Sequence, residues 1–213
     1  MTDAPPSTSL GPVAGVILAG GLARRMGGAD KALVDLAGRP LLAHVIERFA
    51  PQVEPLLISA NGDPARLAGF RLPVVADPLP GHLGPLAGLA AAALWLAENR
   101  PDVRLLASVA VDSPHLPRDL VARLGAALAA APAAGSALAA SGGRTHPVAA
   151  LHRLDGLADL VEELASGATR RVMSWLETRG AITVEFVDSD GDPFVNLNRP
   201  DDVAALAARP ARK

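Results

Sequence analysis

Short apolar, β-branched runs alternate along this chain with longer segments in which apolar residues recur at helical spacing. The apolar runs predict strands at residues 13–18, 54–60, 72–76, 104–111, 137–141, 146–151 and 182–187. The helical spacing predicts helices that begin near residue 41, cover about 86–98, 120–128, 157–164 and 170–178, and open again at Pro200. Strands that alternate with helices predict a single-domain α/β fold: a doubly wound, Rossmann-like, mostly parallel sheet with helices on both faces.

The predicted domain covers residues 12–208, with a disordered leader at 1–11 and a flexible tail at 209–213. The start, MTDAPPSTSLGP, has neither the basic nor the apolar stretch of a signal peptide, and the longest apolar run is shorter than the ~20 residues that cross a bilayer. The chain has no cysteine, which excludes disulfides, thiolate metal sites and a cysteine nucleophile and fits a cytoplasmic protein. A formal net charge of −2 argues against a broad nucleic-acid-binding surface.

Ligands of open α/β sheets bind beyond the carboxyl ends of the strands. In this chain the rule nominates the loops at 18–31, 59–63 and 77–85 and the turn at Asp112 as neighbours. It predicts that polar residues scattered over the sequence form one site at this edge of the sheet.

The first of these loops, LAGGLARRMGGADK (residues 18–31), combines four glycines with two adjacent arginines and a lysine. Glycine lets backbone N–H groups approach an anion closely, and the N-terminus of a following helix adds positive potential. The spacing fits neither the P-loop pattern nor GxGxxG. We interpret the loop as an anion site with Arg25 and Lys31 as its cations; a purely structural turn is the alternative.

Three polar residues stand at predicted strand ends. Asp112, in VAVDSP, suits a Mg²⁺ ion held by one or two carboxylates and substrate phosphates, or it is a turn residue before Ser113. Asn61 offers both a donor and an acceptor for a base or ribose, and Asp77 offers a second metal ligand or an acceptor. Both are also common turn formers.

Further candidates come from later segments. GPLAG (84–88) opens a helix and is either an anion-facing N-terminus or a close helix–sheet contact. His146 lies in GGRTHP beside Arg144, although no histidine pair has metal-ligand spacing and no GxSxG elbow is present. Arg170 and Arg171 either hold a phosphate or lie along the surface.

The segment FVNLN near the C-terminus carries two amides. If this segment is extended, Asn196 and Asn198 share one face and suit a polar heterocyclic ligand. Asn198 alternatively caps the helix at Pro200.

With these segments taken together, the sequence resembles the molybdopterin nucleotidyltransferase family, in particular its molybdenum cofactor guanylyltransferases. The resemblance covers essentially the whole chain after the leader, and it rests on an ordered set of blocks: LAGGLARRMGGADK, HVIERFAPQV, ISAN, GPLAG, RTHPVAAL, ATRRVMSWL and FVNLNRPDD. It implies transfer of GMP from GTP to molybdopterin carrying molybdenum, with release of pyrophosphate and a requirement for Mg²⁺. Transient contacts with molybdoenzymes or other cofactor-biosynthesis proteins are implied as well. We expect neither a nucleic acid nor a membrane as a partner.

The resemblance also implies roles for particular residues. Lys31 would contact phosphates, and Asp112 would bind nucleotide and metal; with Arg25 they form the predicted catalytic set. The remaining residues implied to bind the nucleotide are Leu18, Ala19, Gly20, Asn61 and Asp77. The residues implied to hold the pterin are Arg144, His146, Arg170, Asn196 and Asn198.

Two features depart from the family pattern. VAVDSP lacks the Cys and Thr that commonly flank the aspartate, and Asn61 is followed by Gly-Asp in place of a basic residue. The LAGG start favours guanine, since sugar and cytidylyl relatives tend to have LAAG. The alternatives are a cytidylyl- or sugar-phosphate nucleotidyltransferase of the same fold and a non-catalytic molybdopterin carrier.

Overall fold

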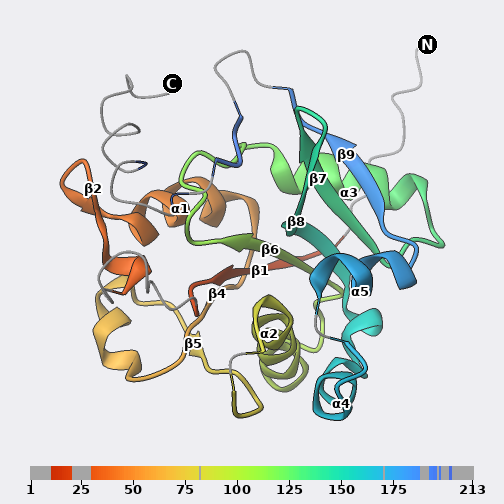
Figure 1. Ribbon diagram of the computed structural model, residues 1–213, viewed down its shortest axis with the longest axis horizontal. Helices are drawn as coiled ribbons and strands as arrows, with labels where there is room; N and C mark the ends of the chain where they lie inside the picture. The colour runs from red at the N-terminus through yellow and green to blue at the C-terminus, as the bar shows by residue number, and fades with distance from the viewer. Residues whose placement is uncertain are drawn as a thin grey trace.

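A computed structural model describes residues 11–20, 30–81, 83–169, 171–187, 192–195, 197 and 202. Its centre is a seven-stranded sheet in the order β5-β4-β1-β6-β8-β7-β9 (Figure 1). The strands are β1 (Val13–Leu18), β4 (Leu56–Ser59), β5 (Val74–Val75), β6 (Leu105–Ala110), β7 (Ser136–Ser141), β8 (Arg144–Arg153) and β9 (Ile182–Glu185). All neighbouring pairs are parallel except those that β8 makes with β6 and β7. The predicted single-domain, mostly parallel α/β fold is confirmed.

Helices cover both faces of the sheet, as the doubly wound prediction requires (Figure 1). One face carries α1 (Leu41–Phe49) and α3 (Leu120–Ala130), and the other carries α2 (Pro85–Asn99), α4 (Leu160–Ser166) and α5 (Val172–Thr178). The shorter elements are the hairpin β2 (Asp35–Leu36) and β3 (Arg39–Pro40) and the 3-10 helices η2 (Lys31–Leu33), η3 (Ala50–Gln52), η4 (Pro64–Phe70) and η5 (Leu154–Leu157). Separate apolar cores therefore lie on the two sides of the sheet.

The turn between β7 and β8 is tighter than the sequence predicted. The strands predicted at 137–141 and 146–151 left four residues between them, but the connection is reduced to Gly142 and Gly143, with φ of 55° and 76°. Both angles lie in the left-handed region that a two-residue hairpin turn needs and that glycine adopts without strain. Parallel strands need a crossover of a dozen residues or more, so this connection makes β8 antiparallel to β7.

Other predictions fall on parts of the chain that the structure does not describe. The leader lies there except for Gly11, as do the 209–213 tail and the helix expected at Pro200 apart from Asp202. Among the described residues, no helix has the length and apolarity to cross a bilayer.

Strand β8 carries His152, whose side chain is fully buried between two serines. Its Nε2 lies 3.2 Å from the Ser108 hydroxyl, and its Nδ1 lies 2.9 Å from the Ser136 hydroxyl. Ser108 donates its own hydrogen to the Val148 carbonyl, so Nε2 must donate to Ser108 and Nδ1 must accept from Ser136. Burial lowers the pKa of His152 from 6.5 to about 4, so the ring is neutral in the folded protein at neutral pH.

Because His152 is buried in its neutral form, we expect the folded protein to lose stability in acid. Below pH 6.5 the unfolded chain binds a proton at His152 that the folded chain does not bind until about pH 4. The contribution of neutral His152 to the free energy of unfolding is therefore fully present above pH 6.5 and is lost as the pH falls from 6.5 to about 4. The shift corresponds to a loss of about 3 kcal/mol in the free energy of unfolding. Urea unfolding at pH 7 and pH 4.5 should therefore show a smaller pH dependence for His152→Gln than for the wild type. The same change in the free energy of unfolding between the two pH values for His152→Gln and for the wild type would refute the assignment.

Candidate functional site

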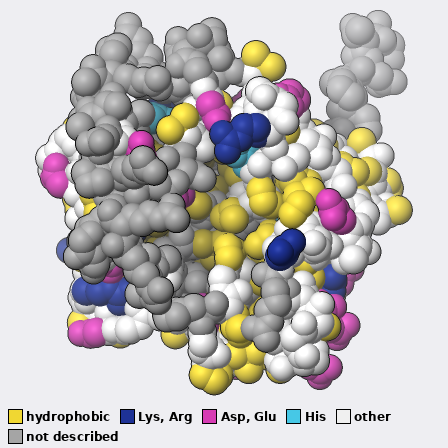
Figure 2. Space-filling model, viewed as in Figure 1, with side chains coloured by type: hydrophobic (Ala, Val, Ile, Leu, Met, Phe, Trp, Pro, Cys, Tyr) yellow, Lys and Arg dark blue, Asp and Glu magenta, His cyan; other side chains and the backbone are white. Residues whose placement is uncertain are grey.

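A pocket of about 690 Å³ opens beyond the carboxyl ends of β1, β4 and β6. It is lined from the predicted loops and from the start of β8, by Leu18, Gly20, Ser59, Asp77, Gly84, Pro85, Gly88, Val109, Ala110, Asp112, Ser113, Leu116, Arg144, Thr145, His146, Pro147, Val148, Ala149 and Phe194. On the face shown in Figure 2, hydrophobic side chains gather over β6 and β8, with basic side chains at two points on the edge. The site therefore combines an apolar floor with charged groups at its rim.

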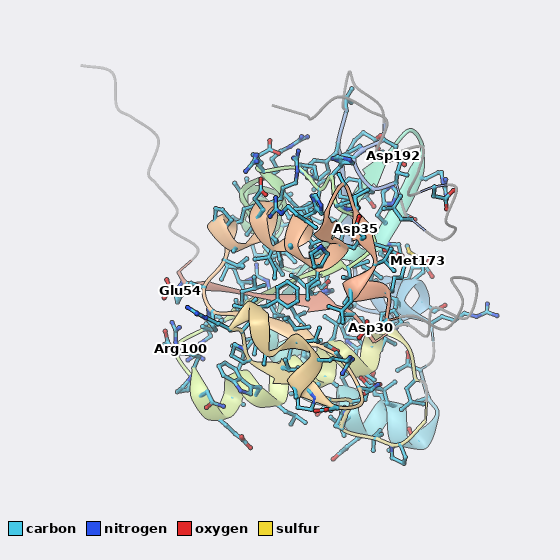
Figure 3. The ribbon with its side chains drawn as sticks, turned by 90° about the vertical axis from the view of Figure 1, so that its left-hand side faces the viewer. Asp30, Asp35, Glu54, Arg100, Met173 and Asp192 are labelled. Atoms are coloured by element: carbon cyan, nitrogen blue, oxygen red, sulfur yellow. The ribbon has the colours of Figure 1, made fainter. Side chains whose placement is uncertain are left out.

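The end of the sheet that carries this pocket is seen from the side in Figure 3. Asp30 and Asp192 lie toward the end at which β1 terminates, whereas Glu54 and Arg100 lie at the opposite end. Strands β1 and β6 pair with Leu18 opposite Ala110, so the residues that follow them in sequence leave the sheet side by side.

Lys31 and Asp112, the two charged residues predicted to share one site, are in contact in this region. Lys31 Nζ lies 2.6 Å from Asp112 Oδ2, although 81 residues separate the two in sequence. Their side chains are only 13% and 16% exposed. The backbone also fixes this corner, because the Val111 amide donates to the Leu18 carbonyl and the Leu197 amide donates to the Asp112 carbonyl. A largely desolvated ion pair thus stands at the junction of β1, β6 and the FVNLN segment.

The second carboxylate oxygen of Asp112 suits a metal ion. Asp112 Oδ1 is buried and has no hydrogen-bond partner within the described part of the chain. Burying a carboxylate oxygen without a partner is costly, and a divalent cation is a ligand that satisfies it. The described residues contain no cluster of three or more His, Asp or Glu side chains that would hold a metal alone. The donor set therefore fits Mg²⁺ shared between one carboxylate and substrate oxygens.

Asn61 and Asp77 form a reciprocal pair. Asn61 Nδ2 donates to Asp77 Oδ2 at 2.7 Å, and the Asp77 amide donates to Asn61 Oδ1 at 2.9 Å. Asp77 lines the pocket, while Asn61 lies beside Gly20, where a Cβ would come within 3.8 Å of Asn61 Nδ2. One end of the Asn61 side-chain amide thus binds the Asp77 carboxylate, and the other end binds the Asp77 backbone amide, at the pocket wall.

Arg66 on η4 is a site-supporting residue that the sequence analysis missed. Its guanidinium donates to the Asn61 carbonyl at 2.8 Å and to the Asp63 carbonyl at 2.5 Å, and its Nε pairs with the Asp30 carboxylate. Asp30 in turn accepts from the Ala32 amide and caps η2, the helix that begins with Lys31. The basic residue expected directly after Asn61 is absent, but an arginine five residues later joins this loop to Lys31.

The GPLAG segment makes the close helix–sheet contact that was one of its two interpretations. Its first residues also lie at the pocket, and the role of an anion-facing N-terminus stays a prediction. Gly84 and Pro85, at the N-terminus of α2, line the pocket. A Cβ at Gly88 would lie 2.5 Å from Ser59 Oγ and 2.6 Å from a methyl of Leu18, so only glycine allows the helix to pack this closely on β1 and β4.

His146 lines the pocket from β8. Its ring stacks on Phe194, with centroids 4.6 Å apart, and its Nε2 lies 2.8 Å from the Ser141 hydroxyl. Ser141 donates to Asp192 Oδ1 at 2.6 Å, and the Phe194 amide donates to the same oxygen at 2.9 Å. Burial lowers the pKa of His146, and Arg144 acts in the same direction, against the opposing charges of Asp192 and Glu185.

The remaining predicted residues differ in what the structure shows. Ala19 is buried beside the pocket, with its amide donating to the Ser59 carbonyl, and Arg144 lines the pocket. Four candidates lie outside the described residues, namely Arg25, Arg170, Asn196 and Asn198. Their roles stay predictions.

Residues 15–182 match the family of the MobA-like NTP transferase domain. A molybdenum cofactor guanylyltransferase of Bradyrhizobium sp. is 50% identical over 198 residues, which cover 93% of this chain and 93% of that protein. The crystal structure of molybdopterin-guanine dinucleotide biosynthesis protein A from Archaeoglobus fulgidus has a TM-score of 0.70 at 20% identity and covers 92% of this chain and 96% of its own. A 4-diphosphocytidyl-2C-methyl-D-erythritolsynthase from Anaerococcus prevotii has the same TM-score at 10% identity, over 93% and 96% of the two chains. The two solved structures share the fold of this chain.

Proposed function

Because the chain belongs to the molybdenum cofactor guanylyltransferase family and is a nucleotidyltransferase, we propose that it transfers GMP from GTP to molybdopterin carrying molybdenum. Pyrophosphate is the second product, and Mg²⁺ is required. The observation that carries this proposal is the contact between Lys31 and Asp112, 2.6 Å apart, at a pocket of about 690 Å³ that Asp112 lines. The reaction is proposed to occur in the cytoplasm, with the product passed on to molybdoenzymes.

The chemistry asks little of the protein beyond positioning and charge. An oxygen of the pterin's terminal phosphate attacks the α-phosphorus of GTP, and the bond from that phosphorus to the β-phosphate oxygen breaks, so pyrophosphate leaves with the electron pair. The attacking oxygen is already anionic and needs no general base. Two unit charges 4 Å apart interact by about 4 kcal/mol at an effective dielectric of 20, so repulsion between the two substrates is a large part of the barrier. Lys31 would offset it, together with Arg25.

Asp112 is the proposed holder of the metal, through the buried Oδ1 that lacks a partner among the described residues. When bound, Mg²⁺ supplies Lewis-acid stabilisation and a template for the phosphates. In the same proposal Leu18, Ala19 and Gly20 line the guanine and ribose pocket. Asp77 contacts the nucleotide, and Asn61 fixes the Asp77 carboxylate.

A titration of nucleotides tests the proposed donor. With Mg²⁺ present, GTP should raise the melting temperature more than CTP, UTP or ATP at the same concentration, because a ligand that binds only the folded state stabilises it more the more tightly it binds. Preferential stabilisation by CTP would favour the alternative of a cytidylyltransferase of the same fold. Release of pyrophosphate from GTP in the presence of molybdopterin separates an enzyme from a carrier.

Replacing Arg66 tests whether its contact with Asp30 holds Lys31 in position. Arg66→Gln should lower kcat/KM for GMP transfer by ~10- to 10²-fold, because Asp30 loses its partner and Lys31 then loses its fixed position. The matched control is Arg100→Gln, which breaks an arginine–aspartate pair at the opposite end of the sheet and should leave kcat/KM unchanged (Figure 3). Equal rates for the two variants would mean that Arg66 does not position Lys31.

A further inference from the structure

The wall of the pocket formed by β8 contains a chain of three polar side chains from separate segments. His146 on β8, Ser141 on β7 and Asp192 follow one another through contacts of 2.8 and 2.6 Å. In the β7–β8 ladder Ala139 pairs with His146 and Ser141 pairs with Arg144, so His146 and Ser141 lie on the same face of the sheet. The register shifts next to this pair, where β8 contains Pro147, a residue that cannot donate to the ladder.

Counting hydrogens along this chain fixes the direction of each bond. Burial alone would raise the pKa of Asp192, but the hydrogen bonds from the Ser141 hydroxyl and the Phe194 amide, together with the charges of His146 and Arg144, hold it below its usual value. Asp192 is thus an ionised acceptor at neutral pH. The serine has one hydrogen and gives it to Asp192, so Ser141 Oγ must accept from His146, and the hydrogen of neutral His146 must lie on Nε2.

The other ring nitrogen is then an acceptor. No described residue donates to or accepts from His146 Nδ1, and the side chain, 13% exposed, lines the pocket. Phe194 stacks on the ring at an interplanar angle of 30° and restricts its rotation. Burial, the first cause of the lowered pKa of His146, and the nearby Arg144 favour the neutral ring, while Asp192 and Glu185 oppose them. A neutral, oriented acceptor is suited to a substrate N–H group and unsuited to an anionic phosphate.

We propose that Ser141 and Asp192 are positioning residues that hold His146 in its Nε2–H tautomer, so that Nδ1 accepts a hydrogen bond from an N–H group of the substrate. The donor's identity as the pterin ring rests on the proposed function; the tautomer does not. In this arrangement His146 distinguishes the heterocycle of the acceptor substrate from the phosphates, which the Lys31 side of the pocket receives.

Nitrogen-15 NMR of the histidine rings in the free full-length protein tests the tautomer. Comparison with His146→Gln assigns the signals, and the wild type should show a hydrogen on Nε2 of His146 and a bare Nδ1. Asp192→Asn should lower the pKa of His146, because the charge that raises it is removed, and Ser141→Ala should add signals of the Nδ1–H form. A wild-type spectrum with the hydrogen on Nδ1 would overturn the proposal.

Steady-state kinetics tests the use of Nδ1. Asparagine places a polar atom near Nδ1 and glutamine near Nε2, so the two amides separate the acceptor from the contact with Ser141. His146→Gln should raise KM for molybdopterin about tenfold and His146→Asn about threefold, as expected for one neutral hydrogen bond lost or partly replaced. KM for GTP and kcat should change less than twofold.

The outcomes of these measurements separate a role of His146 in substrate binding from a purely structural role. A larger rise for His146→Asn than for His146→Gln, or equal rises for both substrates, would assign His146 a structural role and overturn the proposal. A wild type that shows the Nε2–H tautomer but transfers no GMP would instead contradict the proposed function. Ser141→Thr, which keeps the hydroxyl, should restore KM for molybdopterin relative to Ser141→Ala if Ser141 acts through His146, and failure to do so in a folded variant would count against the proposal.

Discussion

An Asp112→Asn variant should lose ~10³-fold or more in kcat/KM for GMP transfer while remaining folded. Asparagine keeps the size and one oxygen of the side chain but removes the negative charge. That charge faces Lys31 through Oδ2, and its Oδ1 is buried with no partner among the described residues. The loss should appear in the rate of pyrophosphate release at saturating GTP and should not be restored by raising Mg²⁺ across a wide concentration range.

Asp102→Asn is the matched control for this variant. Asp102 is also paired with a basic side chain, Arg100, but it is exposed and lies far from the pocket end of the sheet. Its replacement should leave kcat/KM unchanged. If Asp112→Asn retains the wild-type rate, Asp112 neither holds a metal nor contacts the nucleotide, and the proposed function loses the observation that carries it.

The meeting of Lys31 and Asp112 could be predicted from sequence because it depends on the backbone. Each residue follows an apolar strand, directly for Asp112 and after a glycine-rich loop for Lys31, and parallel strands end at the same edge of a sheet. The antiparallel direction of β8 could also have been predicted from the sequence, because the two glycines after Ser141 leave no room for a crossover connection.

The contacts that support the site could not be predicted in the same way. Arg66 approaches Asp30 from a 3-10 helix, and Asp192 approaches Ser141 across 51 residues of sequence. Such pairs depend on side-chain directions in irregular segments, which no periodicity specifies. Asn61 is a further example: its position at a strand end does not specify that both ends of its side-chain amide contact Asp77, and its role in binding the nucleotide stays a prediction.

A Lys31→Met variant should lower kcat/KM by ~10²–10³-fold, because methionine keeps the apolar stem but removes the ammonium group that would offset charge between the two substrates. The chain has one other lysine, Lys213, so Lys213→Met is a matched control that should transfer GMP at the wild-type rate. An unchanged rate in Lys31→Met would show that the ammonium group does not act on the reacting phosphates.

Stability separates this catalytic effect from damage to the fold. Lys31→Met leaves the largely buried carboxylate of Asp112 without its cation, which should lower the free energy of unfolding by roughly 1–3 kcal/mol. The double variant Lys31→Met/Asp112→Asn removes both charges and should regain most of that stability in urea unfolding, since losing one partner of a buried pair costs more than losing both. Its GMP transfer should nevertheless stay as low as that of Asp112→Asn. Recovery of activity together with stability would mean that the pair serves the fold alone.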